Sequence, residues 1–279
     1  MTSDQRVALV TGSSSGNGYE TSLTLARKGF MTYATMRNLT KGESIKSVAE
    51  KEKLPLKIVQ LDVTDDSSVK NAVQSIISEA GIDVLVNNAG NAVSGAFEDL
   101  AMEEMKDQYE TNLSGLIRVT QAVLPIMRKQ KSGIIVNISS GVGRFAIPGQ
   151  SVYVSTKFAI EGLSESIAYE LEPFGIKIVL VEPGFVKTNI ANNMVIAKKS
   201  QDPNSPYSKL MENIVSHIEH GLETGSSPDV VAKVVLKVVT SENPNLRYLA
   251  GKDIETVMEA KRNMSDEESH KMMKQRWRV

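Results

Sequence analysis

The chain has 279 residues, no cysteine, and 32 Lys and Arg residues against 33 Asp and Glu residues. Its length suits one large α/β domain as well as a pair of average domains, and the lack of cysteine excludes disulfides, thiolate nucleophiles and cysteine-based metal sites. The near-zero net charge and the scattered basic residues argue against nucleic acid as the main partner.

The N-terminal residues Met1–Arg6 include an acidic residue and lead straight into an apolar run, which is not the pattern of a signal peptide. No apolar run approaches the ~20 residues needed to cross a bilayer. We therefore expect a cytoplasmic protein without a transmembrane segment.

Short apolar runs alternate with longer helix-compatible stretches between residue 6 and the region of residue 250. These runs predict strands at Val7–Val10, Met31–Thr35, Leu56–Leu61, Val84–Val86, Gly133–Ile138 and Ile176–Val181, with a short seventh at Leu246–Leu249. Apolar strands that alternate with helices are typical of a parallel sheet covered on both faces. The predicted fold is an α/β, doubly wound, Rossmann-like parallel sheet in a single domain, residues 1–279.

Two helices can be placed from local patterns. Asp65 or Asp66 can cap a helix that ends near Gly81. The stretch from Gln150 to Pro173 is apolar around much of its circumference, which predicts a helix buried on more than one side.

Two segments near the C-terminus depart from the strand and helix alternation. Residues 189–227 are irregular in pattern and rich in Asn, Ser, Pro and Lys, and they follow the sixth strand. We interpret this insert as a substrate lid, because ligands bind at the carboxyl ends of the strands, or alternatively as a surface segment with a helix packed on it. Residues 252–279 form a charged, helix-permissive extension, whose last residues we expect to be solvated or to dock in an oligomer.

A glycine-rich loop follows the first strand and opens the first helix. Glycine at position 12 permits a tight turn, at 16 it leaves room for a pyrophosphate, and at 18 it permits close contact of helix and strand. A helix N-terminus at this place would offer N–H groups to phosphates, and the loop predicts dinucleotide contacts from Gly12, Ser14, Ser15, Gly16, Asn17 and Gly18.

The residues after the second and third strands select the cofactor. An acidic residue after the second strand would bind the ribose hydroxyls of NAD, but here Arg37 follows Met36. Arg37 can bind a 2′-phosphate, which favours NADP over NAD, unless it is simply a solvated loop residue. Asp62, beside Val63, can accept a hydrogen bond from the adenine amino group or act only as a helix cap.

A phenol and an ammonium lie four residues apart at Tyr153 and Lys157, and therefore on one face of the predicted helix. A nearby cation lowers the pKa of a phenol, so this pair can transfer a proton. Ser140 ends the fifth strand, where its hydroxyl can hold a substrate carbonyl oxygen. A Tyr and a Lys at this spacing are also common as a plain surface pair.

Together these motifs resemble those of the classical short-chain dehydrogenase/reductase family over roughly residues 5 to 250. The resemblance rests on the glycine loop, Asn87-Asn88-Ala89-Gly90, Asn112, Ser140, the Tyr153 and Lys157 pair, and Pro183-Gly184. Residues Tyr33–Arg37, Leu61–Thr64 and Glu172–Gly175 are similar to the branch that contains hydroxysteroid and retinol dehydrogenases. Asn17 departs from the aliphatic residue usual in the family, so the geometry of the loop needs testing.

The resemblance implies an oxidoreductase acting on CH–OH groups. Tyr153 would be the general acid/base, Lys157 would lower its pKa and bind the nicotinamide ribose, Ser140 would orient the carbonyl, and Asn112 would hold a water. Asn88, Ala89 and Gly90 would border the adenosine ribose, and Pro183, Gly184, Val186 and Thr188 would contact the nicotinamide end. Asn87 can instead join the central strands through side-chain hydrogen bonds.

Three alternatives stay open: a 3-oxoacyl-thioester reductase of the same fold, a catalytically silent NADP-binding regulator, and a metalloenzyme using His217 and His220. The last has little support, because no carboxylate lies at a metal-ligand spacing, and we predict no metal.

The pocket is expected between residues 91–94, 141–151 and the insert around Met194, and to be mostly apolar through Val93, Phe145, Ile147 and Met194. We expect Arg144 to lie at the surface. A hydrophobic ketone or secondary alcohol is therefore the expected substrate.

The helix at 150–173 and its neighbour at 112–129 carry more apolar residues than one sheet face can cover, among them Val154, Phe158 and Leu163, and Leu113, Leu116, Ile117, Val119, Val123 and Leu124. We expect them to pair in a homodimer or homotetramer.

Overall fold

The computed structural model describes residues 5–188 and 194–277 and confirms the predicted fold class. Seven parallel strands form one sheet in the order β3-β2-β1-β4-β6-β7-β9. The strands are β1 (Val7–Val10), β2 (Met31–Met36), β3 (Leu56–Gln60), β4 (Val84–Asn87), β6 (Gly133–Ile138), β7 (Ile176–Pro183) and β9 (Arg247–Ala250). The strand order reverses beside β1, which places the switch point of the sheet between β1 and β4.

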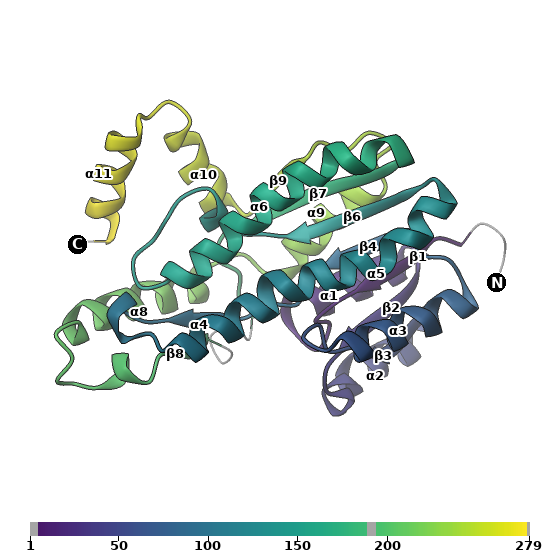
Figure 1. The fold of residues 1–279 in the computed structure, drawn as a ribbon, viewed down its shortest axis with the longest axis horizontal. Helices are drawn as coiled ribbons and strands as arrows, with labels where there is room; N and C mark the ends of the chain where they lie inside the picture. Colours follow the sequence, from purple (N-terminus) through teal and green to yellow (C-terminus); the bar gives the residue numbers. More distant parts are fainter. Residues whose placement is uncertain (1–4, 189–193, 278–279) are drawn as a thin grey trace.

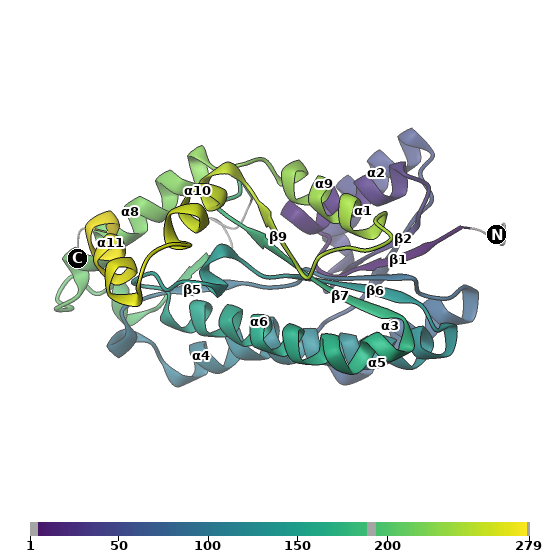
Figure 2. The same cartoon turned by 90° about the horizontal axis from the view of Figure 1, so that it is seen from above.

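Helices cover both faces of the sheet, as Figure 2 shows. One layer holds α3 (Asp66–Glu79), α5 (Gly115–Gln130) and α6 (Ser151–Leu171), and the other holds α1 (Gly16–Arg27), α2 (Glu43–Glu52) and α9 (Pro228–Val239). Each face has its own apolar cluster, so both sides of the sheet are buried. This burial explains why the strands read as continuous apolar runs.

The predicted helix boundaries agree with the structure to within a few residues. The Asp65 carboxylate accepts a hydrogen bond from the Ser68 N–H and caps α3, which ends at Glu79. The expected helix at 112–129 begins inside a π-helical turn, η3 (Glu110–Ser114), that joins α4 (Met102–Tyr109) to α5.

Two short strands that the sequence does not predict form a second parallel sheet. β5 (Ala92–Ser94) pairs with β8 (Met194–Ile196), about a hundred residues later in the chain. After β8 come η6 (Lys199–Gln201) and α8 (Ser208–Thr224). Two hydroxyls of this insert, Ser200 and Ser205, donate to the carboxylate of Asp99, which lies in η2 (Phe97–Asp99). The described part of the insert is therefore fastened beside β5.

The C-terminal extension is helical, as predicted, and forms α10 (Lys252–Lys261) and α11 (Asp266–Trp277). The sequence led us to expect a solvated or oligomer-docking end. Instead Trp277, the last described residue, is only 6% exposed and packs with residues of α8. Figure 1 shows α11 beyond α10, at the end of the molecule that also carries α8. Within residues 5–188 and 194–277, no helix is long and apolar enough to cross a membrane.

Candidate active site

A cavity of about 550 Å³ opens at the carboxyl ends of the strands, where ligands of doubly wound sheets bind. It is lined by every predicted site residue except Gly18 and Asn112: Gly12, Ser14, Ser15, Gly16, Asn17, Arg37, Asp62, Val63, Asn88, Ala89, Gly90, Ser140, Tyr153, Lys157, Pro183, Gly184, Val186 and Thr188. Three short 3₁₀ helices lie between the longer elements: η1 (Leu39–Gly42) precedes α2, η4 (Gly141–Gly143) follows β6, and η5 (Glu172–Phe174) follows α6.

The glycine loop has the backbone that its glycines predict. Gly12 and Gly16 have positive φ angles of 69° and 60°. A Cβ on Gly12 would lie 2.9 Å from the Ala89 Cα, and one on Gly18 would collide with the Gly12 carbonyl oxygen, so Gly18 serves loop packing and not the cavity wall. The turn therefore forms although Asn17 replaces an aliphatic residue. The side-chain oxygen of Asn17 is buried without a hydrogen-bond partner in the described chain.

The N-terminus of α1 is open to an anion. Ser15 occupies the N-cap position without a side-chain capping hydrogen bond, and the first turn holds no acidic residue. The unpaired N–H groups and the positive end of the helix dipole therefore face the cavity, which is the arrangement that binds a pyrophosphate.

Asn88 supports this loop from the neighbouring strand. Its side-chain amide donates to the carbonyl oxygens of Thr11 and Gly12 at 3.0 and 3.2 Å. Asn87 has the structural role left open above, since its amide donates to Thr120 on α5 and Asn137 on β6, each at 2.9 Å.

The part of the cavity beside the ends of β2 and β3 carries two cations and one carboxylate. Arg37 is exposed after β2, and its guanidinium makes no hydrogen bond or ion pair with any described residue. Lys41, which the sequence did not single out, lines the same part of the cavity from η1. The Asp62 carboxylate accepts from the Thr64 N–H and hydroxyl at 3.0 and 2.8 Å, so it shapes the turn after β3 while it lines the cavity.

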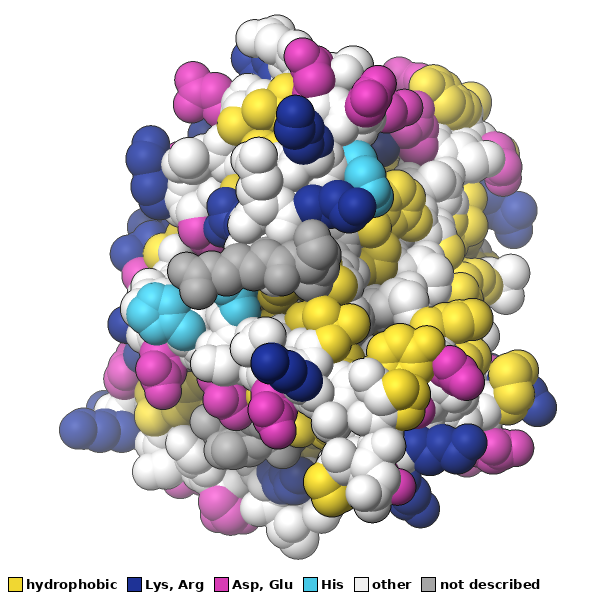
Figure 3. Space-filling model, turned by 90° about the vertical axis from the view of Figure 1, so that its left-hand side faces the viewer, with side chains coloured by type: hydrophobic (Ala, Val, Ile, Leu, Met, Phe, Trp, Pro, Cys, Tyr) yellow, Lys and Arg dark blue, Asp and Glu magenta, His cyan; other side chains and the backbone are white. Residues whose placement is uncertain are grey.

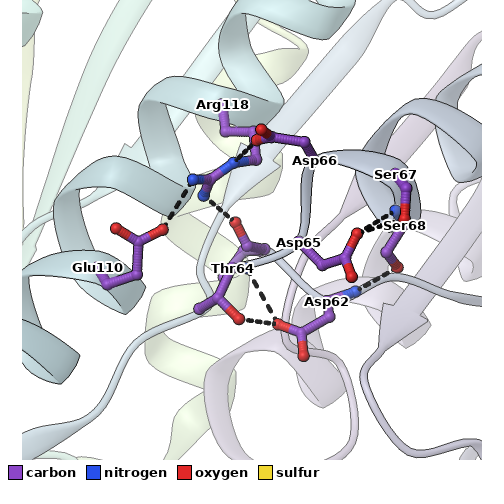
Figure 4. Close-up of polar contacts among 9 residues, drawn as sticks. Asp62, Thr64, Asp65, Asp66, Ser67, Ser68, Glu110 and Arg118 are labelled. Carbon is purple, nitrogen blue, oxygen red and sulfur yellow. Dashed lines mark hydrogen bonds and ion pairs between the residues drawn. The ribbon is translucent and has the colours of Figure 1, made fainter.

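Arg118 holds this turn against the helical layer (Figure 4). Its guanidinium donates to the Val63 carbonyl oxygen at 2.5 Å, to Glu110 at 2.7 Å and to Asp66. One side chain thus links the Asp62 turn to the π-helical turn that contains Asn112. No sequence signal marks Arg118, because two of its partners, Val63 and Asp66, lie 55 and 52 residues earlier in the chain.

Ser140, Tyr153 and Lys157 lie together in the wall of the cavity. The Ser140 side chain lies near the Tyr153 phenol and lowers its pKa, and the Ser140 hydroxyl also accepts from the Val142 N–H at 3.4 Å. The Lys157 ammonium lies 5.5 Å from the centre of the Tyr153 ring and donates to the Ile138 carbonyl oxygen at 3.0 Å. The β6 strand and the α6 helix therefore bring together three groups that are spread over 18 positions in the sequence.

Burial shifts the pKa values of both titrating groups. It raises the pKa of Tyr153 to about 12, against a lowering by the nearby Ser140 side chain. Burial also lowers the pKa of Lys157 to about 8, while the carboxylate of Glu161 raises it. The predicted lowering of the Tyr153 pKa by Lys157 is therefore wrong for this geometry, because desolvation of the phenol dominates.

Asn112 lies behind the cavity wall, 1% exposed. Its side-chain oxygen accepts from the Asn91 N–H at 2.9 Å, and its amide donates to the Asn91 carbonyl oxygen at 2.9 Å and to Thr156 at 3.3 Å. These bonds attach the π-helical turn to the loop after β4. The water-holding role stays a prediction.

The part of the cavity that the sequence predicts to hold the substrate is mostly apolar, but its walls differ in part from the expected ones. Phe145 and Ile147 line it as predicted, whereas Val93 is buried in the small cluster around β5. The side chain of Met194 lies outside the described residues. Further walls come from α8, α10 and α11, through Ile218, Leu222, Asp253, Ile254, Val257, Met273, Arg276 and Trp277.

A buried charge network lies behind the catalytic helix. Glu161, one turn after Lys157 on α6, accepts from Arg247 at 2.9 Å. Glu182 on β7 is 1% exposed and lies 3.3 Å from Arg144 and 3.5 Å from Arg247. Arg144 is exposed, as predicted, and points to this network.

Among the described residues, no group of His, Asp and Glu has the arrangement of a metal site. The ring of His217 packs against that of Trp277, with 4.4 Å between their centres. His217 therefore helps to hold α11 on α8.

Comparison with known proteins agrees with this geometry. The sequence model for the short chain dehydrogenase family matches residues 6–199. The chain is 38% identical over 247 residues to 3-ketodihydrosphingosine reductase of Bacteroides thetaiotaomicron, covering 88% of each protein. It is 36% identical over 257 residues to human retinol dehydrogenase 8, covering 88% of this chain and 82% of the relative.

Among solved structures, a short-chain dehydrogenase from Streptomyces avermitilis superimposes with a TM-score of 0.83 at 29% identity, over 100% of this chain and 98% of the other. The resemblance to the branch with retinol dehydrogenases is confirmed. The chain therefore belongs to the short-chain dehydrogenase family and is an oxidoreductase of that family.

Proposed function

We propose that this protein interconverts a ketone or aldehyde and an alcohol on a mostly apolar substrate, with NADP(H) as cofactor. The observation that carries the proposal is that Ser140, Tyr153 and Lys157 line one cavity, with the Lys157 ammonium 5.5 Å from the centre of the phenol ring. These groups line the same cavity as the glycine loop.

The residues of the cavity fit a dinucleotide. The uncapped N-terminus of α1 would hold the pyrophosphate, and the missing carboxylate after β2 leaves Arg37, with Lys41 nearby, to bind a 2′-phosphate. Asp62 and Val63 would border the adenine, and Val186 and Thr188 the nicotinamide end. When bound there, a nicotinamide cofactor would supply or accept the hydride.

Tyr153 is the proton donor in the reducing direction. Its raised pKa keeps the phenol protonated at neutral pH, so a proton is available when negative charge develops on the carbonyl oxygen. Ser140 holds that oxygen and stabilises the phenolate once the proton has left. In the oxidising direction the phenolate form of Tyr153 takes the proton from the alcohol.

Apolar side chains around the catalytic groups favour a hydrophobic substrate. Phe145, Ile147 and Phe185 lie in the cavity wall beside Ser140 and Tyr153. The relatives named above act, by their names, on 3-ketodihydrosphingosine and on retinol, which supports this substrate class.

A cofactor-consumption screen tests the proposal. Steroid, retinoid, acyl and sugar carbonyls are offered with NADPH or NADH, and we expect turnover of the apolar ketones with NADPH. A protein that binds NADPH but turns over none of them would be a cofactor-binding regulator and would refute the proposal.

We also propose a homodimer or homotetramer. Four of the residues expected at the interface are instead buried within one chain: Leu116, Val119, Val123 and Val154. Phe158 on α6 and Met102 on α4 remain 46% and 57% exposed. Light scattering at micromolar concentration measures the mass of the particle and so gives the number of chains. A stable, active monomer would refute the assembly.

A further inference from the structure

The cavity continues past the catalytic groups under the two C-terminal helices. Ile254 on α10 packs directly against Gly141, the residue after Ser140. The Asp253 carboxylate accepts from the Phe185 N–H at 2.8 Å and faces Gly184. α10 therefore covers the reacting end, and α11 lies beyond it, away from the sheet (Figure 1).

One face of α11 forms the far wall of this cavity. Met273, Arg276 and Trp277 lie three and four residues apart, so they share that face, and all three line the cavity. Trp277 fixes the position of the face, because it is buried and packs on His217. Met273 and Trp277 belong to the apolar cluster that includes Ile147 and Phe185.

Arg276 is the exception in this apolar wall. The cavity residues on α8, α10 and α11 include no other Lys or Arg. The Arg276 guanidinium makes no hydrogen bond or ion pair within the described ranges 5–188 and 194–277. Asp253, the acidic residue on this side, is tied to Phe185 near the catalytic end. The charges on the exposed face at this end of the molecule alternate in sign, without a continuous basic patch (Figure 3).

From this arrangement we infer that the substrate carries an anionic group, a carboxylate or a phosphate, at the end remote from its reacting carbon, and that Arg276 binds it. A guanidinium has only donors, and its planar fork matches the paired oxygens of an oxyanion. The apolar stretch between Ser140 and α11 would hold the hydrocarbon part. The inference rests on the proposed ketone reduction.

The test compares a medium-chain keto acid, whose ketone and carboxylate lie at opposite ends, with its methyl ester and with the matching keto alkyl phosphate. Arg276→Gln removes the charge, and Lys274→Gln is the matched control, because Lys274 is exposed on the same helix and does not line the cavity. Turnover gives KM and kcat. Calorimetry on each charge variant in the Tyr153→Phe background gives binding without chemistry.

We expect Arg276→Gln to weaken binding of the anionic ketones roughly 10- to 100-fold, with kcat and the ester unchanged. Lys274→Gln should change neither. If Arg276→Gln weakens the binding of the keto acid more than that of the keto alkyl phosphate, the natural group is a carboxylate. The reverse order identifies a phosphate. Equal effects on acid and ester, or no effect on either anion, would overturn the inference. If no ketone turns over, the proposed function fails, while the calorimetric comparison still decides the role of Arg276.

Discussion

The two ends of the cavity are built in different ways. The cofactor end is made of loops that leave adjacent strands of one sheet, with Gly12, Arg37, Asp62 and Asn88 each within a few residues of a strand end. The substrate end is assembled from α8, α10 and α11, which come late in the chain, and α8 and α11 pack on each other. The first depends on sheet topology, and the second on side-chain packing between distant segments.

This difference separates the effects of mutations. A change at the cofactor end should alter dinucleotide binding without affecting the substrate, and a change in α11 should do the opposite. Tyr153 lies where the two ends meet, so its loss should affect the reaction itself.

The largest effect is expected from Tyr153→Phe. This change removes the phenol proton with little loss of volume, so kcat should fall about 10²- to 10⁴-fold. Cofactor binding, measured by NADPH fluorescence, should stay near the wild-type value. Retention of most of the turnover in a contamination-free preparation would show that another group donates the proton.

A smaller, selective effect is expected from Arg37→Ala. Loss of a charge-assisted contact to the 2′-phosphate should weaken NADPH binding by roughly one to two decades and leave NADH nearly unchanged. Lys46→Ala, an exposed cation on α2 that does not line the cavity, is the control. Parallel losses for both cofactors would mean that Arg37 does not discriminate between them.

The sequence placed the residues around the glycine loop correctly in the cavity wall, because the determinants of their positions are local. The turn at Gly12 follows from the glycines themselves, and the Tyr153 and Lys157 pair follows from helical spacing. Parallel strands bring their carboxyl ends to one edge, so Asp62 and Ser140 could be placed without any tertiary contact.

The substrate end could not be predicted in the same way. The β5 and β8 strands have three residues each, too few to show a periodicity, and they pair across about a hundred residues. The charged sequence of α11 resembles a solvated tail, and only its packing on α8 buries Trp277. The pKa of Tyr153 was misjudged because burial of a phenol cannot be read from spacing.

Trp277→Ala tests the substrate end directly. The change removes the ring that packs against His217 and should loosen α11, since a buried Trp to Ala change costs about 3–5 kcal/mol in a well-packed site. We expect the KM for the ketone to rise about tenfold, while the NADPH affinity stays the same and protease cleavage within α11 becomes faster. An equal loss of cofactor affinity would show that the two ends are coupled.

The smallest effect concerns the charge behind the catalytic helix. Burial lowers the pKa of Lys157 to about 8, and the Glu161 carboxylate opposes this shift by favouring the ammonium. Turnover that needs the ammonium should fall as the pH rises through this pKa. Glu161→Gln removes the opposing charge, so the pKa of Lys157 drops further and the alkaline limb of the kcat profile moves to lower pH.

The same shift has a consequence for stability. The pKa of Lys157 is lower in the folded chain than its ordinary value of 10.5, so burial of the ammonium destabilises the fold below about pH 8 and this cost fades as the pH rises toward 10.5. In Glu161→Gln the unfavourable free energy of burying the Lys157 ammonium is larger. The pH range over which it fades begins at a lower pH. Glu165→Gln is the matched control, because Glu165 also pairs with Arg247, at 2.7 Å, but is not among the groups that shift the pKa of Lys157. If both variants moved the alkaline limb alike, the ion pairs of Arg247, and not the charge of Glu161, would govern Lys157.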